Sequence, residues 1–184
     1  MNSGRSNTTI NIPNALTLFR LLLTPLFVIL LIRNQLKPAL AVFFLAGISD
    51  GLDGLIARCF NQRTVIGAYL DPVADKVLLM SSYVCLGVLG IAPAWLAVVV
   101  LSRDILIVIG IAILTLMEKK VRIQPSRISK CTTALQLFTV AASLIAPGPL
   151  LFLTILFWAT AVLTTISGIH YIYMGMAIFQ RIDE

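Results

Sequence analysis

The chain has 184 residues, of which 59% are apolar and 12% are charged, about half the charged fraction expected of a soluble domain. A mean hydropathy of +0.97 implies more apolar surface than a globule of this length can bury, which excludes a water-soluble protein. In a membrane protein the net charge of +6 is a topology signal, so we expect no nucleic-acid partner.

Six apolar segments of transmembrane length follow one another along the chain. The breaks between them are rich in turn-forming residues, and none is long enough for a second domain. The sequence therefore predicts an all-α integral membrane protein with six transmembrane helices. The expected helices are Ala15–Ile32, Pro38–Ala57, Leu70–Leu89, Pro93–Met117, Thr132–Ile145 extended backward to Lys130, and Leu150–Met174.

The start of the chain differs from the rest in composition. Residues 1–9 are polar and are expected to form a flexible tail, and Ile10–Asn14 is expected to form a short interfacial segment. Residues 10–184 are then expected to form a single transmembrane domain.

Lysine and arginine set the expected orientation, because these residues collect in cytoplasmic loops. With the N-terminus inside, the outer turns contain only Arg33 and Lys37. We therefore expect a multi-pass protein of the bacterial cytoplasmic membrane with both termini on the cytoplasmic side. The inner segments contain Arg5, Arg58, Arg63, Lys119, Lys120, Arg122, Arg127, Lys130 and Arg181.

Five of the eight acidic residues lie inside apolar segments, where an unpaired carboxylate costs at least about 2.5–3.5 kcal/mol. Asp50 and Asp53 lie three residues apart and Asp71 and Asp75 four apart, so each pair shares one helix face. A short break makes the two helices antiparallel neighbours. We expect these four carboxylates to surround one small volume near the inner leaflet; the fifth acid is Asp104.

Four clustered carboxylates form an oxygen-only site, which favours Mg²⁺, Mn²⁺ or Ca²⁺ over zinc or copper. Two divalent ions would neutralise them, and the neighbouring Arg58 and Lys76 add positive charge that suits a phosphorylated substrate. The small residues beside the acids include Gly54, Ala57 and Gly67. They either allow close helix packing or make room for a ligand.

The acidic segments spell Asp50-x-x-Asp53-Gly54-x-x-Ala57-Arg58 and, after eight residues, Gly67-x-x-x-Asp71-x-x-x-Asp75. This pattern resembles the signature of the CDP-alcohol phosphotransferase family at all eight positions, and six helices agree with that family's fold. The runs 11–20 and 71–76 resemble the branch that makes phosphatidylglycerol phosphate and cardiolipin. The resemblance implies a membrane-bound homodimer that transfers a phosphatidyl group from CDP-diacylglycerol to an alcohol and releases CMP.

The resemblance also implies a role for each motif residue. Two divalent cations, Mg²⁺ or Mn²⁺, are expected to be held by the four aspartates, Asp50, Asp53, Asp71 and Asp75. Asp75 is also expected to take the proton from the attacking hydroxyl. Such a site supplies charge neutralisation, stabilisation of leaving CMP and a base near the nucleophile. The expected CDP-lipid site comprises Asn14, Thr17, Arg20, Gly54, Ala57, Arg58 and Gly67. The spacing of three predicts that Asn14, Thr17 and Arg20 lie along one side of the first helix.

The sequence leaves the acceptor alcohol open. Arg103 and Asp104 are either a self-neutralising pair that stabilises the bundle, or Arg103 binds the acceptor together with Arg127 and Lys130. The resemblance implies that members using glycerol 3-phosphate are more basic here, and Thr132 stands where their second lysine would be. A lysine at this position is expected to stay hydrated near the inner interface and to improve the use of glycerol 3-phosphate. Because a phosphomonoester dianion favours several cations, we expect phosphatidylglycerol as the acceptor, with glycerol 3-phosphate as the alternative.

A protein of another class also carries carboxylates inside the membrane, namely an ion-coupled transporter. Six helices are few for such a protein. The acidic cluster of the second and third helices has no counterpart in the fifth and sixth, so no inverted repeat is visible. The enzyme is the favoured hypothesis.

Overall fold

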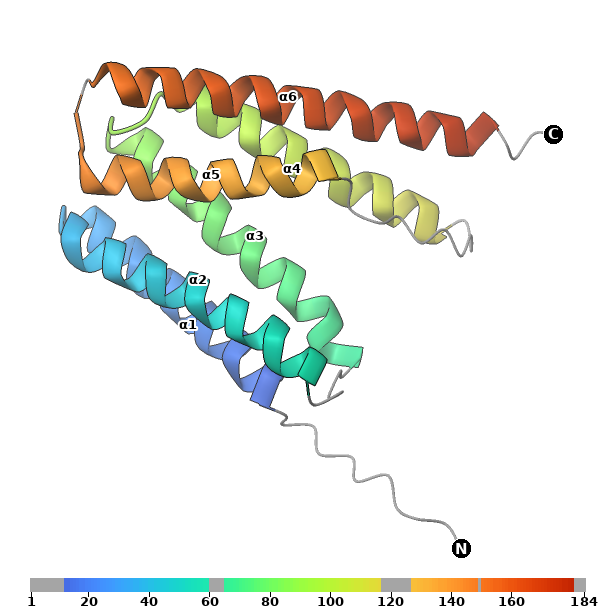
Figure 1. Ribbon diagram of the computed structural model, residues 1–184, viewed down its shortest axis with the longest axis horizontal. Helices are drawn as coiled ribbons and strands as arrows, with labels where there is room; N and C mark the ends of the chain where they lie inside the picture. The colour runs from blue at the N-terminus through green and yellow to red at the C-terminus, as the bar shows by residue number, and fades with distance from the viewer. Residues whose placement is uncertain (1–11, 60–64, 117–126, 149, 181–184) are drawn as a thin grey trace, which may run out of the picture. The chain divides into compact units, whose positions relative to one another are not determined.

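The computed structural model describes residues 12–59, 65–116, 127–148 and 150–180 (Figure 1). Within the helices, the side chains of residues 12–16, 50–59, 65–73, 75, 111–116, 127 and 177–180 lie outside this description. In the described residues the secondary structure consists of six α-helices without a strand. These are α1 (Ile12–Ile32), α2 (Leu36–Cys59), α3 (Val65–Val88), α4 (Ala94–Leu116), α5 (Arg127–Ile145) and α6 (Leu151–Gln180).

All six predicted helices are confirmed as helices, but several begin or end elsewhere. Residues 12–14 belong to α1 rather than to a separate interfacial segment; a proline at position 13 is compatible with this because the first helical turn needs no N–H donor there. α5 begins at Arg127 and α6 continues to Gln180. The bounds differ because hydropathy predicts only the apolar part of a helix, whereas the hydrogen-bonded backbone continues through polar residues at its ends. The expected tail, residues 1–9, lies outside the described residues.

Two of the predicted breaks contain a residue in the left-handed backbone conformation. Asn34 has φ 57° between α1 and α2, and its N–H donates to the carbonyl of Leu31 at 2.8 Å. Gly90 has φ 68° after α3, and the N–H of Ile91 donates to the carbonyl of Leu86 at 3.0 Å. Asparagine and glycine adopt this conformation at low cost, which explains where these two helices end.

Two helices contain apolar stretches long enough to cross a membrane, namely Ile128–Ile145 in α5 and Leu151–Met176 in α6. The other apolar stretches found in the described residues are shorter. Large apolar side chains also point outward: Val88 is 81% exposed and Leu151 is 77% exposed. These features favour a lipid environment, and six spans stay a prediction.

The described residues divide into two compact units, Met1–Ser81 and Ser82–Glu184 in the chain numbering. In the first unit α1 packs along α2, and the rings of Phe27 and Phe43 lie 5.7 Å apart between their centroids. In the second unit α6 packs against both α4 and α5 (Figure 1). The single transmembrane domain stays a prediction.

Candidate functional site

The acidic motif lies on two helices, as predicted. Asp50 and Asp53 belong to α2, which ends at Cys59, and Asp71 and Asp75 belong to α3, which begins at Val65. Asn14 belongs to α1. The side chains of all five lie outside the described set, so the convergence of the carboxylates stays a prediction. The same holds for Gly54, Ala57 and Arg58 in α2, Gly67 in α3 and Arg127 in α5.

Among the described side chains, no group of three or more His, Cys, Asp or Glu could hold a metal ion. The four expected ligands are outside that set, so their role as a cation site stays a prediction. Their chemistry fits the expected cations, because aspartate offers the oxygen donors that Mg²⁺ and Mn²⁺ prefer. Within each pair, the two aspartates lie about one turn apart on a helix whose backbone the structure describes.

α1 carries the part of the expected CDP-lipid site that is described. Thr17 is 0% exposed and Arg20 is 1% exposed, whereas Leu18 between them is 59% exposed. Thr24 continues the buried face, and its hydroxyl donates to the backbone carbonyl of Arg20 at 3.1 Å. The prediction that Asn14, Thr17 and Arg20 share one side of the helix is confirmed for Thr17 and Arg20. Because burying a guanidinium is costly without polar partners, the burial of Arg20 indicates polar surroundings on this face of α1; its role in CDP-lipid binding stays a prediction.

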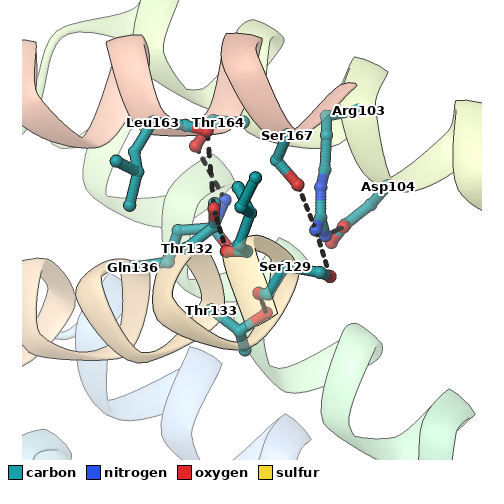
Figure 2. Close-up of polar contacts among 10 residues, drawn as sticks. Arg103, Asp104, Ser129, Thr132, Thr133, Gln136, Leu163, Thr164 and Ser167 are labelled. Carbon is teal, nitrogen blue, oxygen red and sulfur yellow. Dashed lines mark hydrogen bonds and ion pairs between the residues drawn. The ribbon is translucent and has the colours of Figure 1, made fainter. Parts of the chain in front are cut away.

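Arg103 is the centre of a buried polar cluster in the second unit, shown in Figure 2. Its side chain is 4% exposed and that of Asp104 is 1% exposed, and Nη1 donates to Oδ1 of Asp104 at 2.7 Å. Nη2 donates to Oγ of Ser129 on α5 at 2.6 Å and to Oγ of Ser167 on α6 at 2.9 Å. A single guanidinium therefore joins α4, α5 and α6 through charge-assisted hydrogen bonds.

Two further features describe the surroundings of this guanidinium. Its Cζ lies 5.8 Å from the ring centroid of Tyr171 on α6, within the range of a cation–π interaction. Its Nε is buried and has no hydrogen-bond partner among the described residues. Arg103 therefore forms the predicted structural pair with Asp104 and keeps its Nε donor without a partner among the described residues. Sequence reasoning missed Ser129 and Ser167 as partners of Arg103.

The first turn of α5 is the part of the structure that the three residues predicted to bind the acceptor have in common. Arg103 reaches this turn through Ser129, and Lys130, the next residue, is exposed. Arg127 begins the same turn, although its side chain is not described. The structure thus brings the α4 guanidinium to the turn that contains the other two bases.

Polar side chains run along the face of α5 that meets α6. Their spacing of three and four residues keeps them on one side of the helix. This helical period is visible in the sequence and could have revealed the pattern. We call this set the α5–α6 polar seam; its members, all buried, are Ser129, Thr132, Gln136, Thr139, Ser143, Thr160, Thr164 and Ser167.

Hydrogen bonds connect the two helices along the seam. Nε2 of Gln136 donates to Oγ1 of Thr164 at 3.0 Å, and the hydroxyl oxygens of Thr139 and Thr160 lie 2.7 Å apart. Tyr83 on α3 donates its hydroxyl to the backbone carbonyl of Gln136 at 3.1 Å. Such bonds between apolar helices stabilise helix association in a bilayer.

The surroundings of Thr132 differ from those that the sequence predicts. A lysine here was expected to reach hydrated surroundings near the inner interface, but Thr132 is 0% exposed. Its hydroxyl donates to the carbonyl of Ile128 at 2.9 Å and lies 3.4 Å from that of Leu163 on α6. The position belongs to the seam, and the expectation was wrong because the side chain faces α6 rather than water.

Thr132→Lys is therefore expected to destabilise the protein rather than to improve use of glycerol 3-phosphate. A lysine here would place an ammonium in the buried interface between α5 and α6, where its desolvation is costly. We expect the thermal midpoint in detergent to fall by at least about 5 °C. The matched control is Cys131→Lys, one residue earlier and exposed. Equal midpoints for the two variants would contradict the assignment of Thr132 to the seam.

Comparison with known proteins identifies a family for most of the chain. The family model described as CDP-alcohol phosphatidyltransferase matches residues 10–166. This segment contains the acidic motif as well as Arg103 and the first turn of α5.

Individual relatives carry names from two related activities. The chain is 37% identical over 193 residues to human cardiolipin synthase (CMP-forming), a match that covers 94% of this chain and 64% of the human one. It is 33% identical over 171 residues to a probable phosphatidylglycerophosphate synthase of Mycobacterium tuberculosis, covering 88% and 80%. It is 43% identical over 103 residues to CDP-diacylglycerol–glycerol-3-phosphate 3-phosphatidyltransferase of Haemophilus influenzae, covering 53% and 55%. The chain thus spans slightly less than two thirds of the human relative.

Proposed function

The chain belongs to the CDP-alcohol phosphatidyltransferase family, and from this premise we propose that it transfers the phosphatidyl group of CDP-diacylglycerol to an alcohol and releases CMP. The observation that carries the proposal is the complete acidic motif from Asp50 to Asp75, which lies on α2 and α3 inside the matched segment. Family membership also favours an enzyme over an ion-coupled transporter.

The proposal includes an arrangement in the membrane. Helices of 19 to 30 residues are about 28–45 Å long at about 1.5 Å per residue, against about 30 Å of hydrocarbon. All six helices are proposed to span a bacterial cytoplasmic membrane as one domain, residues 10–184, in a homodimer. The basic residues support cytoplasmic termini and a cytoplasmic site, since Arg33 and Lys37 alone lie in the outer turns.

The carboxylates of Asp50, Asp53, Asp71 and Asp75 are proposed to hold two divalent cations, Mg²⁺ or Mn²⁺. When bound, these ions would neutralise diphosphate oxygens and stabilise leaving CMP. The CDP-lipid is proposed to lie along the buried face of α1 that carries Thr17 and Arg20. The other residues proposed to contact it are Asn14, Gly54, Ala57, Arg58 and Gly67.

Asp75 is proposed as the general base. Its carboxylate takes the proton of the acceptor hydroxyl, and the hydroxyl oxygen forms a bond to the phosphorus that carries diacylglycerol. The bond from this phosphorus to the bridging oxygen breaks, and CMP leaves with the electron pair. A positioned carboxylate of this kind typically contributes about 10²–10⁴-fold to the rate.

Phosphatidylglycerol is the proposed acceptor, with Arg103, Arg127 and Lys130 at its binding site. Two observations favour it: Thr132 supplies no cation to this region, and the guanidinium of Arg103 is already paired with Asp104. Glycerol 3-phosphate remains the second candidate because the Mycobacterium tuberculosis relative, matched over 80% of its length, is named for phosphatidylglycerophosphate synthesis.

The proposal predicts which lipid the purified full chain makes. In mixed micelles with labelled CDP-diacylglycerol and Mg²⁺ or Mn²⁺, phosphatidylglycerol should give CMP and cardiolipin faster than glycerol 3-phosphate gives phosphatidylglycerol phosphate. Product analysis distinguishes the two acceptors. Turnover with glycerol 3-phosphate alone would contradict the proposed acceptor, whereas absence of CMP release with every alcohol would contradict phosphatidyl transfer itself.

A further inference from the structure

The protein itself fills most of the hydrogen-bonding capacity of the Arg103 guanidinium. A guanidinium has five N–H donors, one on Nε and two on each Nη. One Nη1 donor goes to Asp104, and the Nη2 nitrogen donates to both Ser129 and Ser167 (Figure 2). The two serine hydroxyls therefore occupy the whole donor capacity of Nη2.

This arrangement restricts how Arg103 can bind an anion. A bidentate contact with a phosphate needs two parallel donors from neighbouring nitrogens of the fork. The guanidinium has two such pairs: Nη1 with Nη2 at its end, and Nε with Nη2 along its side. Nη2 belongs to both. Nε is the nitrogen that has no partner among the described residues. Because both N–H groups of Nη2 are taken, neither pair is complete, and Arg103 offers Nε and the second N–H of Nη1 as separate donors rather than as a fork.

We propose that Ser129 and Ser167 determine acceptor specificity by occupying Nη2 of Arg103. One oxygen of a phosphodiester monoanion, such as the phosphate of phosphatidylglycerol, is matched by the single donor on Nε. The dianion of a phosphomonoester, such as glycerol 3-phosphate, loses the bidentate contact that would favour it. Asp104 adds to the selection by neutralising part of the positive charge. This inference rests on the proposed function and on Arg103 lying at the acceptor site.

Burial makes the two serine contacts persistent. Ser129 is 8% exposed and Ser167 is 0% exposed, so bulk water does not compete strongly for their hydroxyls. The serines come from α5 and α6, whereas Arg103 and Asp104 come from α4. Removing one serine hydroxyl therefore releases an Nη2 donor and leaves the Arg103–Asp104 pair in place.

The test is the ratio of kcat/KM for glycerol 3-phosphate to that for phosphatidylglycerol in Ser129→Ala and Ser167→Ala. A released charge-assisted donor should shift this ratio about tenfold toward glycerol 3-phosphate. The matched control is Ser143→Ala, since Ser143 is a buried seam serine whose hydroxyl donates to the carbonyl of Thr139 in its own helix at 2.8 Å. Its ratio should equal that of the unmodified chain.

A conservative variant distinguishes the effect of losing the hydroxyl from the effect of changing the size of the side chain. Ser129→Thr keeps an oxygen for Nη2 and should keep the original ratio, while Ser129→Ala should not. If Ser167→Ala fails to fold, the Ser129 pair of variants still gives the comparison.

Three results would overturn the inference. An unmoved ratio in both alanine variants would show that the serines do not select the acceptor. An equal fall in kcat/KM for both acceptors would assign the serines a structural role only. An unmodified chain that already prefers glycerol 3-phosphate would show that the occupied fork does not exclude a dianion. These results differ from failure of the proposed function, in which the unmodified chain releases no CMP.

Discussion

Removal of divalent cations is expected to abolish CMP release from CDP-diacylglycerol. The four aspartates of α2 and α3 bear like charges that repel one another when they converge, and the substrate brings further negative charge. Loss of several kcal/mol of charge stabilisation corresponds to a fall of more than about 10³-fold in turnover. The measurement is CMP release by the purified chain in excess chelator.

Restoring individual cations makes this test specific. Mg²⁺ or Mn²⁺ added above the chelator concentration should restore turnover, and Zn²⁺ should not do so equally well, because all proposed ligands are oxygen atoms. Calorimetric titration of the metal-free chain with Mg²⁺ or Mn²⁺ should show binding without any turnover. Full CMP release in excess chelator would contradict the assignment of the aspartates. Solute flux in proteoliposomes without CMP release would instead support a transporter.

Asp75→Asn is expected to lower kcat about 10²–10⁴-fold while leaving the affinity for CDP-diacylglycerol within a few-fold of the original. The amide has nearly the same size as the carboxylate but cannot take the proton of the acceptor hydroxyl. The other three aspartates still supply oxygen ligands. Turnover and equilibrium binding of the CDP-lipid are measured on the same preparation.

Asp53→Asn is the matched comparison, because it removes the same charge from the other pair of carboxylates. It should weaken cation binding and CDP-lipid binding together, and added Mg²⁺ or Mn²⁺ should recover part of its turnover. High cation concentrations should not rescue Asp75→Asn. If both variants lost binding to the same extent and kept the same residual rate, the separate role of Asp75 as base would be wrong.

The six helices and the breaks at Asn34 and Gly90 were predictable because apolar length and turn residues are local properties of the sequence. Asn34 and Gly90 interrupt long apolar runs and adopt positive φ values in the structure. Helix ends were less predictable. Arg127 at the start of α5 and Gln180 at the end of α6 continue backbone hydrogen bonding beyond the apolar stretch, and hydropathy carries no information about that continuation.

The candidate site was predictable only where its residues form a local pattern. Thr17 and Arg20 were placed on one side of α1 by their spacing, and both are buried. The two readings of Arg103 could not be separated because its serine partners lie 26 and 64 residues further along the chain. Thr132 was misjudged for a related reason: its position along α5 was visible, but the neighbour on that side of the helix was not.

The polar seam also has a consequence for how the protein enters the bilayer during synthesis. The apolar stretch of α5 has a mean hydropathy of 1.3 and that of α6 a mean hydropathy of 1.9, so α5 is the less apolar of the two. If α5 partitioned alone, the side chains of Gln136 and Thr139 would meet lipid tails without the partners that α6 provides. If both helices span the membrane as proposed, α5 and α6 should therefore leave the translocation channel together as a helical hairpin, and α5 should become stably integrated only once α6 has emerged from the ribosome.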